Sequence, residues 1–122
     1  MKRAIRVYAD TSVFGGVFDA EFAVASRAFI ELVGRGRFVL VVSPLVGDEV
    51  ASAPRLVQDM FRRLRDGADH IEVTPEVTVL QRAYLRARIV APRWEADALH
   101  VALATVARCA VIVSWNFKHI VN

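Results

Sequence analysis

The chain has few of the features that mark secreted or membrane proteins. It contains one cysteine, Cys109, which excludes a disulfide framework and a cysteine-based zinc site. No apolar run approaches the roughly 18 residues that span a bilayer, because His100 and Arg108 interrupt the longest one. Arg6 and Asp10 break the N-terminal apolar stretch before a signal-peptide core can form. We therefore expect a soluble, cytoplasmic protein.

The sequence also lacks internal repeats, low-complexity segments and a large excess of one charge. Its 122 residues are 55% hydrophobic and 24% charged, with a net charge of +3, which is typical of a compact globular protein and excludes a disordered one. The length fits one domain, so we expect a single domain over residues 1–122.

Arginines gather in two segments in the middle of the chain. They are Arg55, Arg62, Arg63, Arg65, Arg82, Arg86, Arg88 and Arg93. Such runs are usually solvated helix faces. They are also compatible with a surface that binds a polyanion, because arginine contacts phosphates well and steers nucleic acids toward a site. The sequence leaves both interpretations open.

Short runs of β-branched and aromatic residues predict buried strands at Ile5–Ala9, Phe38–Val42 and Val111–Val113. The second and third runs do not alternate with polar residues, as expected for a sheet that is covered on both faces. A weaker strand is predicted over residues 71–73, after a glycine stop at Gly67.

Helical segments separate these strands and are predicted over residues 19–33, 44–51, 55–65, 75–89 and 94–107. Ser43-Pro44 and Thr74-Pro75 each combine an N-cap residue with a proline at the first helical position. Strands that alternate with helices predict an α/β fold, with a mostly parallel central sheet flanked by helices.

Polar residues follow the first and last predicted strands. Asp10 comes directly after the first, and Ser114 and Asn116 come after the last. In a parallel sheet these positions fall at one edge, where ligands bind. A carboxylate at the margin of a core needs a cation, a hydrogen-bond network or solvent. The plainer interpretation is that Asp10 or Ser12 caps the next turn and that Asn116 is a turn residue.

Glu49 differs from its neighbour Asp48 by its place on a helix. On the segment that begins at Pro44, Glu49 shares a face with the apolar Val46 and Val50, whereas Asp48 does not. We therefore expect Glu49 to point inward, either in a salt bridge or in a functional site.

The segment 94–107 is apolar almost all round, which predicts a buried central helix. Its acids, Glu95 and Asp97, lie in the first two turns, where the helix dipole stabilises negative charge. Periodicity does not choose between them. His100 lies one turn beyond Asp97, and we interpret it as a hydrogen-bond partner or a core residue in preference to a metal ligand.

Four short motifs together resemble the PIN-domain proteins of the VapC type. They are Tyr8-Ala9-Asp10-Thr11-Ser12, the helix start from Ser43 to Val50, the helix from Asp97 to Ala104, and the closing stretch from Ser114 to Ile120. They occur in the order of the family and cover nearly the whole chain.

This resemblance implies a metal-dependent ribonuclease, commonly the toxin of a toxin–antitoxin pair, with an antitoxin partner and a homodimeric assembly. It assigns Asp10, Glu49 and Asp97 to an acidic quartet, and it selects Asp97 over Glu95. Asn116 takes the place often held by a fourth acid. Ser12 and Ser114 match hydroxyl positions near the metal. Hard carboxylate oxygens favour Mg²⁺ or Mn²⁺.

The chain departs from the family at two points. Asn116 brings no charge, which weakens the case for a second metal ion. The sequence also ends at Asn122, where the family usually continues into a short closing strand, so that strand is missing or the sheet edge is completed otherwise. These departures leave one alternative, a degenerate PIN-like module that binds RNA or a protein without catalysis. A phosphotransfer receiver is disfavoured, because no acid follows a middle strand.

Overall fold

Four short strands form the centre of the molecule, and each pairing between them is parallel. β1 (Ile5–Ala9) pairs with β2 (Phe38–Val42) on one side and with β4 (Val111–Val113) on the other. β3 (Asp69–His70) pairs with β2, so the strand order is β3-β2-β1-β4. This computed structural model describes residues 4–87 and 95–116. The predicted parallel α/β class is confirmed.

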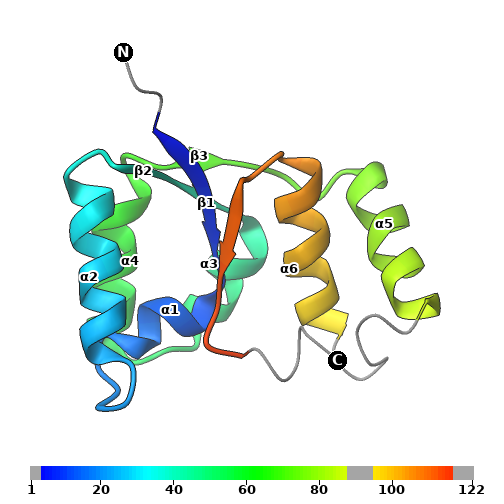
Figure 1. The fold of residues 1–122 in the computed structure, drawn as a ribbon. Helices are drawn as coiled ribbons and strands as arrows, with labels where there is room; N and C mark the ends of the chain where they lie inside the picture. Colours follow the sequence, from blue (N-terminus) through cyan, green and yellow to red (C-terminus); the bar gives the residue numbers. More distant parts are fainter. Residues whose placement is uncertain (1–3, 88–94, 117–122) are drawn as a thin grey trace.

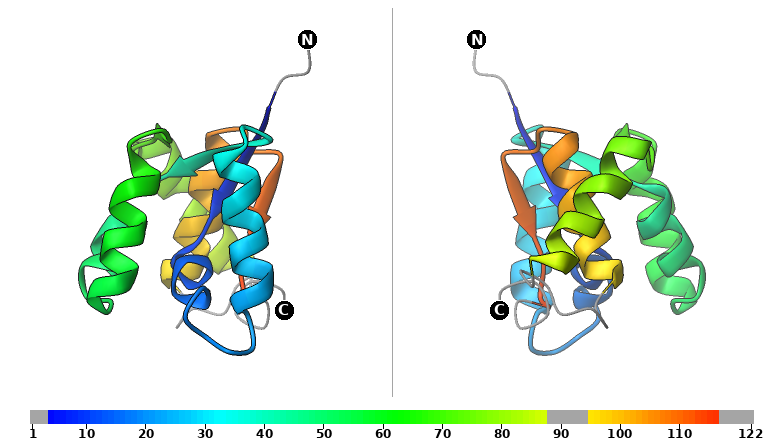
Figure 2. Two further views of the ribbon diagram at one scale, coloured as in Figure 1. Left: turned by 90° about the vertical axis from the view of Figure 1, so that its left-hand side faces the viewer. Right: turned by 90° about the vertical axis from the view of Figure 1, so that its right-hand side faces the viewer.

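Helices cover both faces of this sheet (Figure 1). They are α1 (Thr11–Gly16), α2 (Ala23–Gly34), α3 (Pro44–Ala51), α4 (Arg55–Arg65), α5 (Pro75–Arg86) and α6 (Glu95–Val106). In Figure 1, α2 and α4 lie on one side of the sheet and α6 and α5 on the other. Figure 2 agrees, with α2 (cyan) foremost from the left-hand side and α5 (yellow-green) foremost from the right. None of the described helices is long and apolar enough to cross a membrane.

Local capping explains where two of the helices begin. The Ser43 hydroxyl accepts a hydrogen bond from the backbone N–H of Val46 at 3.3 Å, and Thr74 caps Val77 in the same way at 3.3 Å. A proline follows each cap and supplies a helical φ without losing a hydrogen bond. The predictions for residues 44–51 and 55–65 agree with α3 and α4.

The N-terminal helices differ from the prediction. Residues 11–16, for which no helix was predicted, form α1, and α2 begins at Ala23 and not at residue 19. The Asp19 carboxylate accepts a hydrogen bond from the backbone N–H of Glu21 at 2.9 Å. This side chain therefore stabilises a turn in place of the first helical turn.

The predicted strand over residues 71–73 is displaced to Asp69–His70. Ile71 still donates its N–H to the carbonyl of Val42 at 3.0 Å, but β2 ends there, so the following residues have no strand to pair with. β4 lies at the edge of the described sheet and Val111 is 46% exposed, so β4 is less covered than predicted. The predicted ends of two helices, Ile89 and Trp94, lie outside the described residues.

The core lies on both sides of β1 and β2. Its largest fully buried side chains are Tyr8, Phe14, Leu40 and Leu103. Each such apolar side chain contributes roughly 1.5–3 kcal/mol by leaving water. The C-terminal end of β1 lies inside this core, so the residue that follows β1 is also buried.

Candidate active site at the carboxyl edge of the sheet

Asp10 follows β1 directly, and only 1% of its surface is exposed. Its Oδ1 atom accepts hydrogen bonds from the backbone N–H of Ser12 at 3.0 Å and from the Ser12 hydroxyl at 2.5 Å. Its Oδ2 atom accepts a hydrogen bond from the Ser114 hydroxyl at 2.5 Å. Hydrogen bonds to a carboxylate are stronger than neutral ones and offset the loss of water. Asp10 is therefore the N-cap of α1 and also the centre of a buried polar cluster.

The segment after β4 is joined to the segment after β1 by further hydrogen bonds. The Ser12 hydroxyl accepts from the backbone N–H of Trp115 at 2.9 Å, and the Ser114 hydroxyl accepts from the backbone N–H of Asn116 at 2.9 Å. Each serine therefore binds Asp10 and the chain after β4 at once. Residues from the two ends of the sequence meet at one edge of the sheet.

The Trp115 side chain fixes this segment to α2. Its indole N–H donates to the Ser26 hydroxyl at 2.9 Å, and its ring stacks on Phe22 with the centroids 5.3 Å apart. Gly16 leaves room for this contact, because a Cβ atom there would lie 2.5 Å from Ser26 Oγ and 2.7 Å from Trp115 Nε1. The close approach at this glycine is visible only in three dimensions.

Glu49 lies on α3 and is held by two other elements. Its Oε1 atom accepts hydrogen bonds from the Thr11 hydroxyl at 2.8 Å and from His100 Nε2 at 2.7 Å. The hydrogen bond from His100 lowers the pKa of Glu49 below its usual value, with a smaller contribution from Thr11, although partial burial acts in the opposite direction. The side chain is 37% exposed, so it faces inward only in part, at the margin of the apolar face of α3.

His100 connects Glu49 to the core. It is 2% exposed, and its Nδ1 atom lies 2.6 Å from the hydroxyl of Tyr8, which in turn lies 2.9 Å from Ser43 Oγ. Sequence reasoning singled out neither Tyr8 nor Ser43 as a site residue. The available signal was a tyrosine in a strand covered on both faces, because a buried hydroxyl needs a partner.

Asp97 lies on α6 one turn before His100, so the two residues share a side of that helix. Asp97 is half-buried, whereas Glu95 is exposed. The two acids, which sequence periodicity did not distinguish, therefore differ in their burial. Asn116 is half-buried as well, directly beyond the Ser114 contact.

The carboxylate oxygens have the chemistry that a hard cation requires, but they are not a closed cage. Among the described residues, no three or more His, Cys, Asp and Glu side chains are grouped so that they could hold a metal ion. Mg²⁺ usually takes one or two carboxylates and completes its shell with water and substrate phosphate. Three hydrogen bonds to Asp10 leave about one of its roughly four acceptor positions free. These residues fit that open kind of site.

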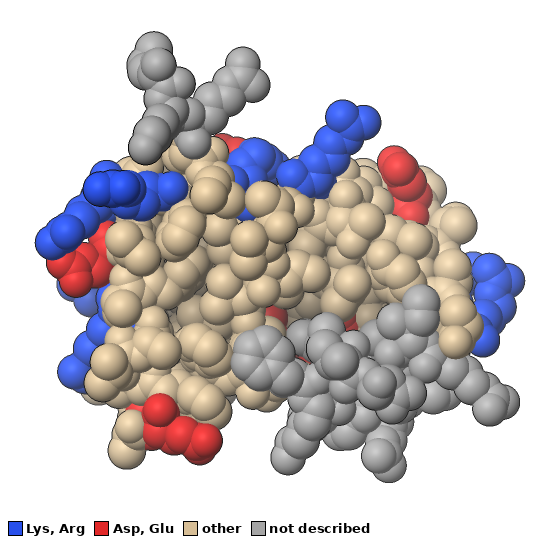
Figure 3. Space-filling view, in the orientation of Figure 1, with Lys and Arg blue, Asp and Glu red and all other residues tan. Residues whose placement is uncertain are grey.

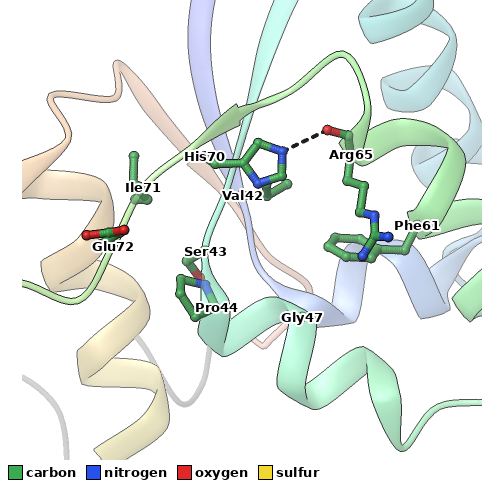
Figure 4. A pocket seen from close by; sticks show the side chains of 9 residues that line it. All are labelled: Val42, Ser43, Pro44, Gly47, Phe61, Arg65, His70, Ile71 and Glu72. Atoms are coloured by element: carbon green, nitrogen blue, oxygen red, sulfur yellow. Dashed lines mark hydrogen bonds between the residues drawn. The ribbon is translucent and has the colours of Figure 1, made fainter.

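A cavity of about 300 Å³ lies beside the candidate site and is separate from it (Figure 4). Its lining includes Ser43, Phe61, Arg65 and His70, and none of Asp10, Glu49, Asp97 or Asn116. His70 Nε2 donates to the carbonyl oxygen of Arg65 at 2.9 Å, and both residues line this cavity. The acids therefore lie at the sheet edge and not in this hollow.

The arginines of α4 are partly accounted for by ion pairs on the same helix. Arg55 and Arg62 lie 4.0 and 3.5 Å from the carboxylate of Asp59, and both are largely exposed. Figure 3 shows Lys and Arg mostly near the rim of one face of the molecule, with none in the middle of the part that is not drawn in grey. The two ion-paired arginines fit the interpretation of a solvated helix face.

Comparisons with known proteins support the fold but not a specific activity. No family model matches the chain, and no curated protein matches its sequence. Among solved structures, the chain is similar to a chain in the crystal structure of VapBC2 from Rickettsia felis. In that structure VapBC2 is bound to a DNA fragment from the VapBC2 promoter. The TM-score is 0.65 over 95% of this chain and 93% of that chain, at 14% identity. The likeness shows a PIN-like α/β fold, as the sequence motifs predicted.

Proposed function

We propose that the chain is a metal-dependent endoribonuclease that hydrolyses phosphodiester bonds in RNA. The observation that carries this proposal is the meeting of Asp10 and Ser114 through a 2.5 Å hydrogen bond, although they lie 104 positions apart in the sequence. That contact creates a buried, charged centre at the edge of a parallel sheet where ligands bind. The PIN-like fold and the four sequence motifs support the same activity.

In this proposal Asp10, Asp97, Glu49 and Asn116 would hold Mg²⁺ or Mn²⁺, with Asp10 and Asp97 as the main ligands. The bound cation would supply an activated water and would stabilise charge that develops on the phosphate. Asn116 would ligate through its amide oxygen and add no charge, so we propose one resident ion.

The remaining polar residues hold these ligands in place. Ser12 and Ser114 fix both oxygens of the Asp10 carboxylate, and Thr11 and His100 fix one oxygen of Glu49. Groups that are already oriented need no rearrangement during the reaction, which lowers its barrier.

We further propose that the chain is the toxin of a type II toxin–antitoxin pair, active as a homodimer and bound by an antitoxin protein. The similar solved structure is VapBC2 bound to promoter DNA, which supports a partner of this kind. The cheapest supporting observation is a neighbouring gene that encodes a small DNA-binding protein. Co-expression of that gene product should give a stable complex and suppress RNA cleavage.

Incubation with a pool of cellular RNA tests the activity. We expect cleavage with Mg²⁺ or Mn²⁺ and none with chelator, and sequencing of the new ends identifies the cleaved bond. Cleavage that persists with chelator contradicts metal dependence.

A second candidate function is a degenerate PIN-like module that binds RNA or a protein without catalysis. Asn116 in place of an acid, and the lack of a group of three metal-binding side chains among the described residues, favour it. A Mn²⁺ titration separates the two candidates. A working nuclease should saturate at sub-millimolar Mn²⁺, whereas the degenerate module should not.

A further inference from the structure

We propose that Tyr8 and His100 are positioning residues that hold the Glu49 carboxylate at the active edge through a buried hydrogen-bond relay. This inference rests on the proposed function and extends it to residues that lie behind the site. The relay runs from the N-cap of α3 to the carboxylate, in the order Ser43, Tyr8, His100 and Glu49.

The relay is short at every step and closed to water along most of its length. The oxygen and nitrogen atoms lie 2.9 Å apart from Ser43 to Tyr8, 2.6 Å from Tyr8 to His100 and 2.7 Å from His100 to Glu49. Tyr8 is 0% exposed and His100 is 2% exposed. Water therefore has little access to the middle of the relay, and each group depends on its protein partner.

One assignment of hydrogens satisfies every member of the relay. An ionised Glu49 only accepts, so the 2.7 Å contact needs a proton on His100 Nε2. In a neutral ring Nδ1 then accepts from the Tyr8 hydroxyl at 2.6 Å. Tyr8 in turn accepts from the Ser43 hydroxyl, which itself accepts from the backbone N–H of Val46.

The environment of Tyr8 supports this assignment independently. The Tyr8 side chain is 0% exposed, so among the described residues its hydroxyl has only the Ser43 hydroxyl and the His100 ring as partners. A tyrosine that always donates to Nδ1 fixes the ring tautomer that presents an N–H to Glu49. Tyr8 therefore acts together with Glu49 to set which ring nitrogen carries the proton.

The relay also relates Glu49 to Asp10. Tyr8 lies on β1 two residues before Asp10, and His100 lies on α6 one turn after Asp97. A hydrogen bond from α6 to Glu49 therefore places the α3 carboxylate relative to the acids on β1 and α6. Without it, in the part of the chain that the structure describes, only the Thr11 hydroxyl holds a glutamate side chain that is 37% exposed, so the carboxylate samples more orientations.

Tyr8→Phe is the sharpest test, because it removes only the hydroxyl. Tyr84→Phe is the matched control, since the Tyr84 hydroxyl contacts Thr105 Oγ1 at 3.3 Å, between α5 and α6, and takes no part in the relay. We expect Tyr8→Phe to lower kcat by about 10- to 100-fold, the usual effect of losing a residue behind a ligand. KM for RNA should change less than about twofold, because substrate contacts remain. Tyr84→Phe should change neither constant.

His100 gives a second pair of variants in case Tyr8→Phe does not fold. The side-chain amide of glutamine can donate to Glu49 in place of Nε2, whereas leucine cannot. We expect His100→Gln to retain more kcat than His100→Leu at a similar RNA KM. Equal losses in the two variants, or a change in KM alone, would overturn the positioning role.

A nuclear magnetic resonance experiment on the metal-free protein separates this inference from the proposed function. Nitrogen-15 spectra should show His100 with a protected proton on Nε2 and none on Nδ1, and Tyr8→Phe should change the Nδ1 shift and speed the exchange of the Nε2 proton. His70 and His119 serve as internal references. An unchanged Nδ1 shift and an unchanged exchange of the Nε2 proton in Tyr8→Phe overturn the relay. If the wild type cleaves no RNA but the tautomer behaves as expected, the proposed function fails and the relay stands.

Discussion

Asp10 and Glu49 are both held at the same edge of the sheet, but by different means. Asp10 is 1% exposed, and its three hydrogen bonds come from residues next to the ends of β1 and β4. Glu49 is 37% exposed and is held by side chains from α1 and α6. The Asp10 carboxylate is thus part of the core, whereas the Glu49 carboxylate lies at its margin and is held there by hydrogen bonds.

This difference separates stability from positioning. Removing a donor to Asp10 leaves a buried charge less satisfied, which lowers the free energy of unfolding. Removing a donor to Glu49 exposes a carboxylate that water can still solvate, so the main loss is its orientation. The predictions below test this contrast, beginning with the largest effect.

Removing the charge of Asp97 should abolish cleavage without unfolding the protein. We expect Asp97→Asn to lose about 100-fold or more in RNA cleavage, the scale of losing one charge-stabilising group at a reacting centre. The thermal melt of the metal-free protein should stay intact or rise, because repulsion between carboxylates is relieved. Glu95→Gln, an exposed acid in the same helical turn, is the control and should keep full activity.

Removing one hydroxyl at each carboxylate compares the two environments directly. Ser114→Ala should lower the free energy of unfolding by about 1.5–3 kcal/mol, because it deletes a hydrogen bond to a buried charge. Thr11→Val should lower it by less than about 1 kcal/mol, because solvent screens the exposed Glu49. Urea unfolding of both variants gives the comparison, and equal losses would show that the two carboxylates are held alike.

Gly16, which packs against Trp115 and Ser26, should tolerate no extra methyl group. Gly16→Ala must displace Trp115 or Ser26, and we expect it to cost about 1–3 kcal/mol, as overpacking of a filled site does. Gly15→Ala is the matched control, because a Cβ atom there would have nothing within 4 Å. Thermal unfolding of the two variants measures the difference, and a neutral Gly16→Ala would show that the Trp115 contact is loose.

The hydrogen bonds that hold Glu49 should also affect how the stability of the protein depends on pH. The folded pKa of Glu49 lies below its ordinary value of 4.5, so its contribution to stability is present above that value and is lost as the pH falls through the folded pKa. The difference in unfolding free energy between the wild type and Glu49→Gln should therefore shrink as the pH falls below 4.5. Solvent screening keeps it under about 1 kcal/mol. If this difference in unfolding free energy does not vary with pH, the hydrogen bonds to Glu49 do not stabilise the fold.

Much of the fold could be predicted from local signals. Ser43-Pro44 indicated the start of α3, and short runs rich in β-branched and aromatic residues marked β1, β2 and β4. The position of Asp10 after β1 predicted that it lies at the carboxyl edge of the sheet, where ligands bind in parallel sheets. These features depend on neighbours within a few residues, which a single sequence displays.

The contacts that support the site were not predictable in the same way. The hydrogen bonds from His100 to Tyr8 and to Glu49 join residues 92 and 51 positions apart. Sequence spacing placed His100 near Asp97 but could not show what its ring faces. The displacement of β3 has a similar cause, because the end of β2 sets how far a neighbouring strand can pair.

The measurement that tests the central claim most directly compares the wild type with Asp10→Asn on one RNA pool with Mn²⁺. Asparagine keeps the N-cap of α1 but removes the charge, so the fold should remain while the candidate site is disabled. The account predicts cleavage by the wild type and no cleavage by Asp10→Asn, with both proteins folded. Full cleavage by Asp10→Asn would contradict it.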